Sequence, residues 1–420
     1  MLTRIGSFDR SVQLLLVNQF TINIGFYMLM PYLAGHLSHD LGMAAWTVGL
    51  VLGMRNLSQQ GLFLIGGTLA DRYGYKKVIV AGCVLRTAGF ALLGLVDTLP
   101  ALLVASAATG FAGALFNPAV RAYLAADSGD RRIEAFAIFN VFYQAGILGG
   151  PLIGLALVTV DFQLVCLTAA TVFAALTIVQ LRWLPAHHAT TPTTGRPTGV
   201  WADWRSVLSN RPFLLFACAM AGSYVLSFQI YLLLPLTLGH HLGGHFTGAL
   251  GGVGLIFAVS ALTAIAGQLR ITDWARRRWS APATVTRGLL LMAASFLPLV
   301  ACTLAAPTGT GPPALLTAVI ACTILLTLGS ALIYPFEMDT VVGLSTGRLV
   351  ATHYGLYNTI AGIAIATGNL LTGALLDTAG TGPLPWITLT TLGAACGGAI
   401  HLLAKDGRLT ATSKPQPTLS

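Results

Sequence analysis

Charged residues are scarce in this chain of 420 residues, where they account for only 9% of the sequence. A soluble globular protein carries about 25% charged residues, most of them on its surface. Glutamate is especially rare, because Glu134 and Glu337 are the only two in the sequence. So few ionised groups exclude an ordinary water-soluble domain, and the hydrophobic content of 55% excludes a disordered chain. The long apolar stretches therefore indicate a protein that lies in a lipid bilayer.

The cysteine and histidine residues lack the spacing of a metal site. The six cysteines stand alone in apolar stretches, without a CxxC pair or a Cys/His cluster, so we expect them to be small core residues. No Walker loop is present, so ATP is not expected to drive the protein directly. The His/Asp cluster that a membrane enzyme would need is also missing. The sequence therefore predicts no metal, no cofactor and no enzyme activity.

Apolar segments long enough to cross a bilayer recur along the chain. A membrane-spanning helix needs about 20 mostly apolar residues, and twelve segments meet this requirement. Their expected limits are 11–35, 45–70, 78–96, 100–124, 136–157, 162–183, 212–236, 247–269, 286–304, 314–343, 352–376 and 386–404. They lack the alternation of barrel strands. The sequence therefore predicts an all-α membrane protein with twelve transmembrane helices.

The longest polar break divides these twelve segments into two sets of six. It is rich in proline and threonine and occupies 184–211. We expect a six-helix bundle in 1–183, a cytoplasmic linker in 184–211, a second bundle in 212–404 and a cytoplasmic tail in 405–420. Equal numbers of helices on both sides predict two pseudo-repeats that arose by duplication.

The basic residues predict the orientation of the chain in the membrane. With the N-terminus placed inside, the outer loops contain no Lys or Arg. These loops are 36–44, 97–100, 158–161, 237–246, 305–313 and 377–385. The positive-inside rule then predicts both termini in the cytoplasm of a multi-pass cell (inner or plasma) membrane protein. The net charge of +9 thus reflects basic residues on the cytoplasmic side of the membrane. We therefore do not expect nucleic acid as a partner.

The segment 67–77, GTLADRYGYKK, joins the second and third predicted helices and resembles the signature loop of the major facilitator superfamily. Gly67 permits close helix approach, Gly74 permits a tight turn, and Asp71 at a helix end can pair with a cation or a helix N-terminus. The resemblance implies that Gly67, Asp71, Arg72, Gly74 and Lys76 form a gating motif that latches the two halves. It also implies the two-bundle major facilitator fold.

A second motif lies in the fifth predicted helix. Gly146, Gly150, Pro151 and Gly154 resemble the antiporter motif of the same superfamily, whose core is G-P-x-x-G. Proline bends a helix and glycine allows intimate packing, so we expect this bend at the interface between the halves. The resemblance implies exchange, whereas an ordinary Gly/Pro kink is the alternative.

Part of the chain also resembles the MdtH-like multidrug exporters of this superfamily. The similar segments are 53–62, 85–90, 113–118 and 161–166, and they cover much of the first half in order and spacing. The second half is similar more loosely, around 231–235. The resemblance implies export of drugs, but it does not name a substrate.

Ionisable residues at membrane depth are costly and therefore indicate function. The candidates for proton coupling are Glu337 and Asp339 in the tenth predicted helix and Arg55 in the second. Similar exporters often place an acid in the first helix, where this chain has the amides of Asn18 and Gln19. We expect one of the two acids to carry the proton, with Arg55 as a modulator. The alternative is that the acids lie near the inner mouth and pair with Arg348 or Arg121.

Aromatic and amide side chains are the candidates for lining a central cavity between the halves. They are Asn18, Gln19, Tyr27, Phe116, Asn140, Gln144, Tyr224, Phe228, Tyr231 and Phe336. Aromatic walls with few charges suit lipophilic cargo, and the alternative is that several of these side chains face lipid.

The residues and the resemblance together predict a secondary active transporter. We expect proton-coupled export of lipophilic small molecules by alternating access, with a small-molecule substrate, protons and the lipid bilayer as partners of a monomer. The alternatives are a proton-independent facilitator, a metabolite importer and, from another class, a polytopic membrane enzyme or scaffold.

Overall fold

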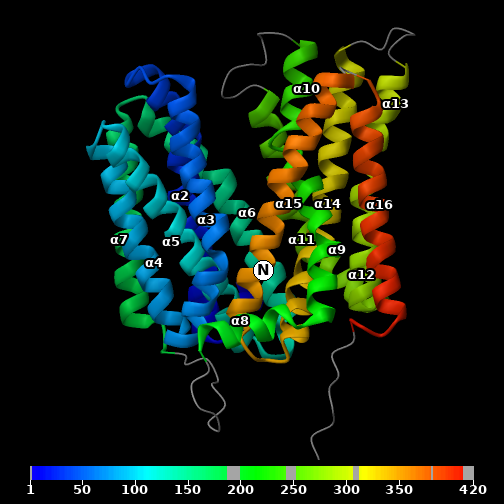
Figure 1. Ribbon diagram of the computed structural model, residues 1–420, viewed down its shortest axis with the longest axis horizontal. Helices are drawn as coiled ribbons and strands as arrows, with labels where there is room; N and C mark the ends of the chain where they lie inside the picture. The colour runs from blue at the N-terminus through cyan, green and yellow to red at the C-terminus, as the bar shows by residue number, and fades with distance from the viewer. Residues whose placement is uncertain (1, 187–198, 243–251, 306–311, 380–381, 410–420) are drawn as a thin grey trace, which may run out of the picture.

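The computed structural model describes residues 2–186, 199–242, 252–305, 312–379 and 382–409. Within these ranges every regular element is helical, which confirms the all-α prediction. The helices form two bundles that stand side by side, one built from the first half of the chain and one from the second (Figure 1).

The first bundle contains six long helices, preceded by the short helix α1 (Leu2–Gly6). They are α2 (Arg10–Gly35), α3 (Ala45–Tyr73), α4 (Tyr75–Leu95), α5 (Leu99–Asp127), α6 (Arg132–Val158) and α7 (Phe162–Trp183). Two single turns join neighbouring helices, η1 (His36–Asp40) and η2 (Gly129–Arg131).

The second bundle contains eight helices because two of the predicted segments are interrupted. They are α9 (Arg211–Phe228), α10 (Leu233–Leu242), α11 (Gly252–Arg278), α12 (Ala281–Ala294), α13 (Leu297–Ala305), α14 (Pro312–Ser345), α15 (Val350–Ala379) and α16 (Leu384–Lys405). The break between α12 and α13 precedes Pro298, which has no N–H to continue the helix. The pairs α9–α10 and α12–α13 therefore each correspond to one predicted segment.

Eleven helical spans of the described residues are long and apolar enough to cross a membrane. Among the predicted segments, only the second, α3, is missing from this set. It is 29 residues long, but Arg55, Asn56, Ser58, Gln59 and Gln60 make its middle polar. Since α3 packs along α4 and α5 as the other helices of its bundle do, we assign it as the twelfth span.

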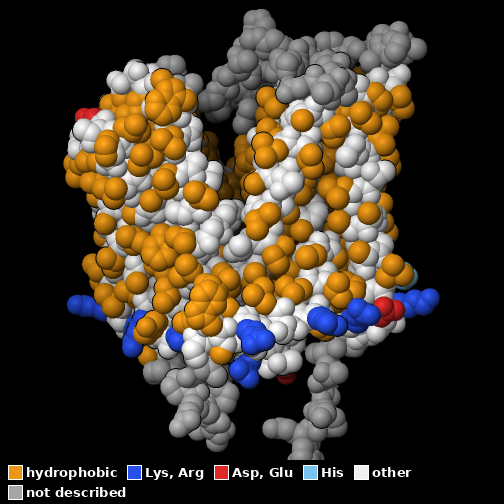
Figure 2. Space-filling model, in the orientation of Figure 1, with side chains coloured by type: hydrophobic (Ala, Val, Ile, Leu, Met, Phe, Trp, Pro, Cys, Tyr) orange, Lys and Arg blue, Asp and Glu red, His pale blue; other side chains and the backbone are white. Residues whose placement is uncertain are grey.

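Buried apolar side chains form a core that extends through both bundles. In the first, the buried rings of Phe90 and Phe173 meet edge to face at 5.4 Å. In the second, Phe296 stacks against Trp386 at 6.3 Å. On the face shown in Figure 2, apolar side chains cover both bundles, while Lys and Arg gather at one end of the molecule. We call this the basic end, and it is also the end at which the chain begins (Figure 1).

The predicted linker 184–211 contains a helix that the sequence analysis did not anticipate. Helix α8 (Val200–Leu208) runs across the basic end, and residues 187–198 before it lie outside the described part of the chain (Figure 1). The guanidinium of Arg72 donates to the carboxylate of Asp203 on α8 at 2.6 Å. Trp204 donates from its indole nitrogen to the hydroxyl of Thr68 at 2.8 Å. The linker is thus attached to the end of α3. The predicted tail lies outside the described residues from 410 onward.

The two bundles approach each other most closely where α3 crosses α15. A Cβ atom added to Gly67 would lie 2.1 Å from the backbone oxygen of Ala351. A Cβ atom added to Gly355 would lie 2.4 Å from the backbone oxygen of Phe63. Only glycine fits at these two places, because backbone atoms cannot move aside as a flexible side chain can. Toward the opposite end the molecule is hollowed between the two bundles (Figure 2).

The glycine contact predicts a specific effect of one added methyl group. Gly67→Ala should weaken the closed arrangement by about 1–3 kcal/mol, the usual cost of overpacking. Gly61→Ala is the matched control, because a Cβ at Gly61 of the same helix meets nothing within 4 Å. Spin labels at the exposed positions Arg182 and Arg277, one in each bundle, would report the separation of the bundles at the basic end. Longer distances are expected in Gly67→Ala alone, and equal distances in both variants would contradict the proposed role of Gly67.

Candidate functional site

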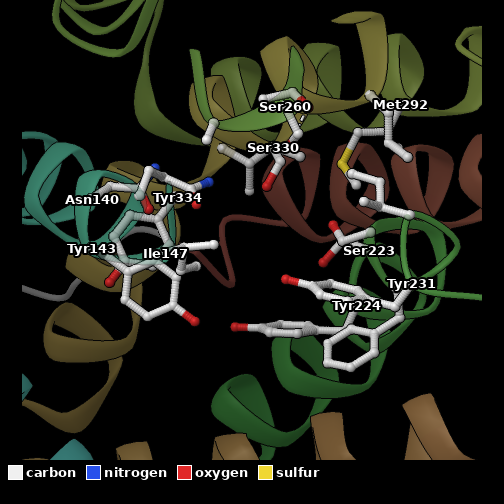
Figure 3. Close-up of a pocket in the computed structure, with 18 of the residues that line it drawn as sticks. Asn140, Tyr143, Ile147, Ser223, Tyr224, Tyr231, Ser260, Met292, Ser330 and Tyr334 are labelled. Carbon is white, nitrogen blue, oxygen red and sulfur yellow. Dashed lines mark hydrogen bonds between the residues drawn. The ribbon is translucent and has the colours of Figure 1, made fainter. Parts of the chain in front are cut away.

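A cavity of about 190 Å³ lies between the two bundles. Its walls combine phenol rings with small hydroxyl groups, and α5, α6, α9, α11 and α14 contribute to them. The polar lining residues are Arg121, Asn140, Tyr143, Gln144, Ser223, Tyr224, Ser227, Tyr231, Ser260, Thr327, Ser330, Tyr334 and Glu337. The hydroxyl groups of Tyr143, Tyr224 and Tyr231 point into the same space (Figure 3). Such walls can hold an aromatic or aliphatic body and also bind polar groups at its edge.

Glu337 is the only acid among the residues that line this cavity. It lies on α14, two residues after Pro335, and is only 4% exposed. Its carboxylate accepts a hydrogen bond from the hydroxyl of Tyr224 at 2.9 Å and another from the hydroxyl of Tyr357. The two donors come from α9 and α15, so three helices of the second bundle hold this acid at the cavity wall.

Arg121 of α5 is the only cation among the lining residues. Its guanidinium donates to the amide oxygen of Asn358 on α15 at 3.2 Å and interacts electrostatically with Glu337 and Tyr334. The first bundle thus supplies the positive group, and the second bundle supplies the negative one. Arg121 lies in the predicted segment 100–124, and from the sequence it was considered only as an alternative partner for the two acids.

Half of the predicted cavity residues line the cavity, namely Asn140, Gln144, Tyr224, Phe228 and Tyr231. Tyr143 was missed, although Asn140, Tyr143, Gln144 and Ile147 follow the i, i+3, i+4, i+7 spacing of one helix face. Tyr27 lies close by, since its hydroxyl interacts with those of Tyr143 and Tyr231.

The structure places four other predicted cavity residues inside the bundles. Asn18 accepts from the side chain of Gln180 on α7 at 2.6 Å, and Gln19 is only 2% exposed. Phe116 packs under a buried arginine of its own bundle. Phe336 is 2% exposed. Neighbours on a helix point about 100° apart, so Phe336 turns away from the cavity while Glu337 faces it.

The other two proton-coupling candidates do not line the cavity. Asp339 accepts a hydrogen bond from Arg132 of α6 at 2.7 Å, and this ion pair joins the two bundles near the basic end. The alternative considered from the sequence paired such an acid with Arg348 or Arg121, whereas the partner of Asp339 in the structure is Arg132. Arg55 of α3 donates to the side-chain oxygen of its neighbour Asn56 and lies over the ring of Phe26, 5.1 Å from its centroid.

An amide pair joins the two bundles at the wall of the cavity. Asn140 of α6 donates to the side-chain oxygen of Gln268 on α11 at 2.6 Å. Gln268 in turn donates to the backbone oxygen of Ala331 on α14 at 2.7 Å.

The loop 67–77 joins the two bundles through Asp71. Its carboxylate accepts from the backbone N–H groups of Ala351 and Thr352 at 3.1 and 2.7 Å, and from the hydroxyl of Thr352 at 2.7 Å. Asp71 of α3 therefore caps the first turn of α15 in the opposite bundle, where free N–H groups favour an anion. The glycine contacts and this cap lie within the same stretch of both helices.

Two other residues of the loop hold it in place within the first bundle. Gly74 adopts a φ of +93°, which favours glycine, and it separates α3 from α4. Lys76 donates to the backbone oxygen of Leu181 at the end of α7 at 2.9 Å. The loop is therefore fixed within the first bundle and binds the second bundle through the carboxylate of Asp71.

The glycines of the antiporter-like motif pack against α2 of their own bundle, which differs from the expected place between the halves. A Cβ at Gly150 would lie 2.8 Å from the Cβ of Tyr27, and one at Gly154 would lie 2.0 Å from the backbone oxygen of Met28. A Cβ at Gly146 would likewise meet α2. The hydroxyl of Tyr32 donates to the backbone oxygen of Pro151 at 2.6 Å. The motif thus fixes α2 against α6, whose opposite face contacts α11 and α14.

Comparisons with known proteins agree with this architecture. Two solved structures share the fold, namely the human organic anion transporter MFSD10 and an auto-inhibited POT family peptide transporter. The first gives a TM-score of 0.69 at 18% identity, covering 93% of this chain and 99% of that chain. The second gives a TM-score of 0.66 at 17% identity, and the alignment covers 97% of this chain and 99% of that chain. At these identities the likeness concerns the fold alone.

Sequence relatives show the family directly. A protein of Mycobacterium tuberculosis named an MFS-type transporter is 53% identical over 374 residues, which are 89% of this chain and 87% of the relative. The multidrug resistance protein MdtH of Salmonella typhi is 31% identical over 286 residues, 68% of this chain and 69% of that protein. A sequence model described as Major Facilitator Superfamily matches residues 15–368. These findings confirm the resemblance carried by the loop 67–77 and the prediction that the chain is no enzyme: it belongs to the major facilitator superfamily of transporters.

Proposed function

We propose that this transporter exports lipophilic small molecules in exchange for protons. The observation that carries the proposal is the position of Glu337, a buried acid at the wall of the cavity between the two bundles. A transported proton needs a group that holds it in one state and releases it in another. Burial favours the neutral acid, whereas a nearby cation favours the carboxylate, so a change in the distance to Arg121 can shift the balance.

The walls of the cavity support lipophilic cargo. Tyr143, Tyr231 and Phe257 offer ring faces, while the serines offer hydrogen bonds that do not demand one particular geometry. The relative MdtH of Salmonella typhi is named a multidrug resistance protein, and its similarity supports the same class of activity for this chain.

The direction of access follows from the basic end. By the positive-inside rule we place this end, with both termini, in the cytoplasm of the cell membrane. The contacts of Asp71, Asp339 and Gln268 close the bundles at that end, so the cavity belongs to a state that faces outward. In alternating access these contacts open and the opposite ends come together. We propose that a single chain carries out this cycle.

A facilitator without proton coupling is the second candidate. The amides Asn18 and Gln19 favour it, because they stand in α2, where similar exporters often have an acid. The two candidate functions differ in whether a pH gradient drives uphill transport. Replacing Glu337 distinguishes them.

Replacing Glu337 tests proton coupling directly. Glu337→Gln keeps the size of the side chain and its ability to accept from Tyr224, but it removes the proton-binding group. In proteoliposomes with an imposed pH gradient, we expect uphill transport to fall to the level of empty vesicles, while downhill exchange of substrate persists.

The comparison variant is Asp339→Asn, since Asp339 pairs with Arg132 away from the cavity lining. It should change the rate but keep the response to the pH gradient. Uphill transport that survives in Glu337→Gln, and also in the variant with both acids replaced, would refute proton coupling through these acids and leave the facilitator.

The cap formed by Asp71 predicts a gating effect. Asp71→Ala removes the acceptor of three hydrogen bonds at the start of α15, and loss of a helix cap costs about 0.5–2 kcal/mol. We expect the basic end to open more often, which lengthens the distance between spin labels at the two bundles, and transport to slow. Asp97→Ala, at an exposed acid between α4 and α5, is the control. Unchanged distances in Asp71→Ala would show that the cap does not hold the bundles together.

A further inference from the structure

Two arginines lie at membrane depth in the first bundle without an acid near them in the sequence. Arg55 is in the middle of α3, and Arg86 is in the middle of α4. Helices α2, α4 and α7 contain no Asp or Glu at all, and the acids of α3, α5 and α6 lie in their first or last turns. Positive charge inside the bilayer is costly, so its retention without a counter-charge indicates a function.

Arg86 is enclosed by aromatic rings and is only 3% exposed. Its guanidinium carbon lies 4.8–5.8 Å from four ring centroids, those of Phe26, Phe90, Phe116 and Phe173. One terminal nitrogen donates to the backbone oxygen of Thr109 at 2.8 Å, whereas the Nε–H has no acceptor among the described residues. Cation–π contacts stabilise the arginine partially, but they leave its charge uncompensated.

Arg55 shares the ring of Phe26 with Arg86, since the two guanidinium carbons lie 5.1 and 5.0 Å from its centroid. Arg55 is the more accessible of the two, and its side-chain partner is the neutral amide of Asn56. It also interacts with Tyr27, whose hydroxyl interacts with the cavity residue Tyr231. Arg55 therefore adjoins the transport cavity, and Arg86 adds a fixed positive potential behind it.

The charges in and beside the cavity do not balance. The three arginines Arg55, Arg86 and Arg121 outnumber the single lining acid Glu337, and none of the three forms an ion pair within the described ranges. The Glu337 carboxylate already accepts from two tyrosine hydroxyls. A cationic molecule would meet net positive charge here, whereas an anionic molecule would supply the missing counter-charge.

We infer that the cargo is an amphipathic organic anion whose acidic head group pairs with Arg55 while its apolar body lies against the tyrosines of the cavity. This inference rests on the proposed transport function and narrows it to one class of substrate. Arginine suits this role because its planar guanidinium binds a carboxylate or sulfonate with two parallel hydrogen bonds.

The test uses three probes that share one fluorescent body and differ only in charge. They are dansyl-glycine (anionic), its methyl ester (neutral) and dansyl-ethylenediamine (cationic). Equilibrium binding to the purified full-length protein and transport in proteoliposomes of phosphatidylcholine are both measured. We expect the anion to bind more tightly than the ester by about tenfold, as a charge-assisted hydrogen bond predicts, and the cation to bind least.

Variants of Arg55 assign the preference to this residue. Arg55→Gln should reduce the preference for the anion by about tenfold, and Arg55→Lys should restore part of it. Arg287→Gln is the matched control, because Arg287 also lies over an aromatic ring, that of Trp279 at 4.1 Å, but is exposed and outside the cavity lining. It should leave the preference unchanged.

Several outcomes would overturn the inference. The inference is wrong if the three probes bind equally, if the cation binds more tightly than the anion, or if no probe binds. It is also wrong if added phosphatidylglycerol competes with the anion, since the group bound at Arg55 would then be a lipid head group. Transport of the ester or the cation with a pH response would overturn the inference but leave the proposed function intact. Anion binding without transport of any probe would support the inference while contradicting the proposed function.

Discussion

The two bundles are held together at the basic end by contact between the backbones of α3 and α15. Gly67 and Gly355 allow this approach, and Asp71 uses it to reach the free N–H groups at the start of α15. Since the cap acts on main-chain groups, it fixes one register of the two helices. The amide pair of Asn140 and Gln268 and the ion pair of Arg132 and Asp339 also join the bundles, between α6 and its partners α11 and α14.

The interior of the transport path is polar without being richly charged. Hydroxyl groups and amides supply most of its hydrogen bonds, as the two tyrosines on Glu337 illustrate. Such groups avoid the large desolvation cost of ions, so the few ions that remain dominate the electrostatics. The separation of Glu337 on one bundle from Arg121 on the other makes their interaction depend on how the bundles are placed, which is what coupling a proton to the movement requires.

The sequence predicted the features that a bilayer imposes directly on composition, and it did not predict the direction of individual side chains. Long apolar segments and the loop around Asp71 predicted the helices and the family, and the rarity of acids directed attention to Glu337. The orientation of side chains was harder to predict, because helices surrounded by lipid and protein are apolar on all faces and have little hydrophobic periodicity. For that reason Phe116 and Phe336 could not be separated from Tyr143, nor could α8 be recognised within a polar linker.

Because the charges beside the cavity are unbalanced, the membrane voltage affects the equilibrium between the two states of the transporter. In the proposed outward-facing state, the voltage falls mainly across the closed basic end, so charges beside the cavity lie near the potential of the opposite side. Reorientation carries them to the potential of the basic side, at about 2.3 kcal/mol for each net charge and 100 mV. With the basic end in the cytoplasm, as proposed, a negative cell interior therefore favours the state in which the empty protein opens toward the basic end. The anion inferred to bind at Arg55 cancels part of this positive charge, so the voltage has less effect on the loaded protein than on the empty one.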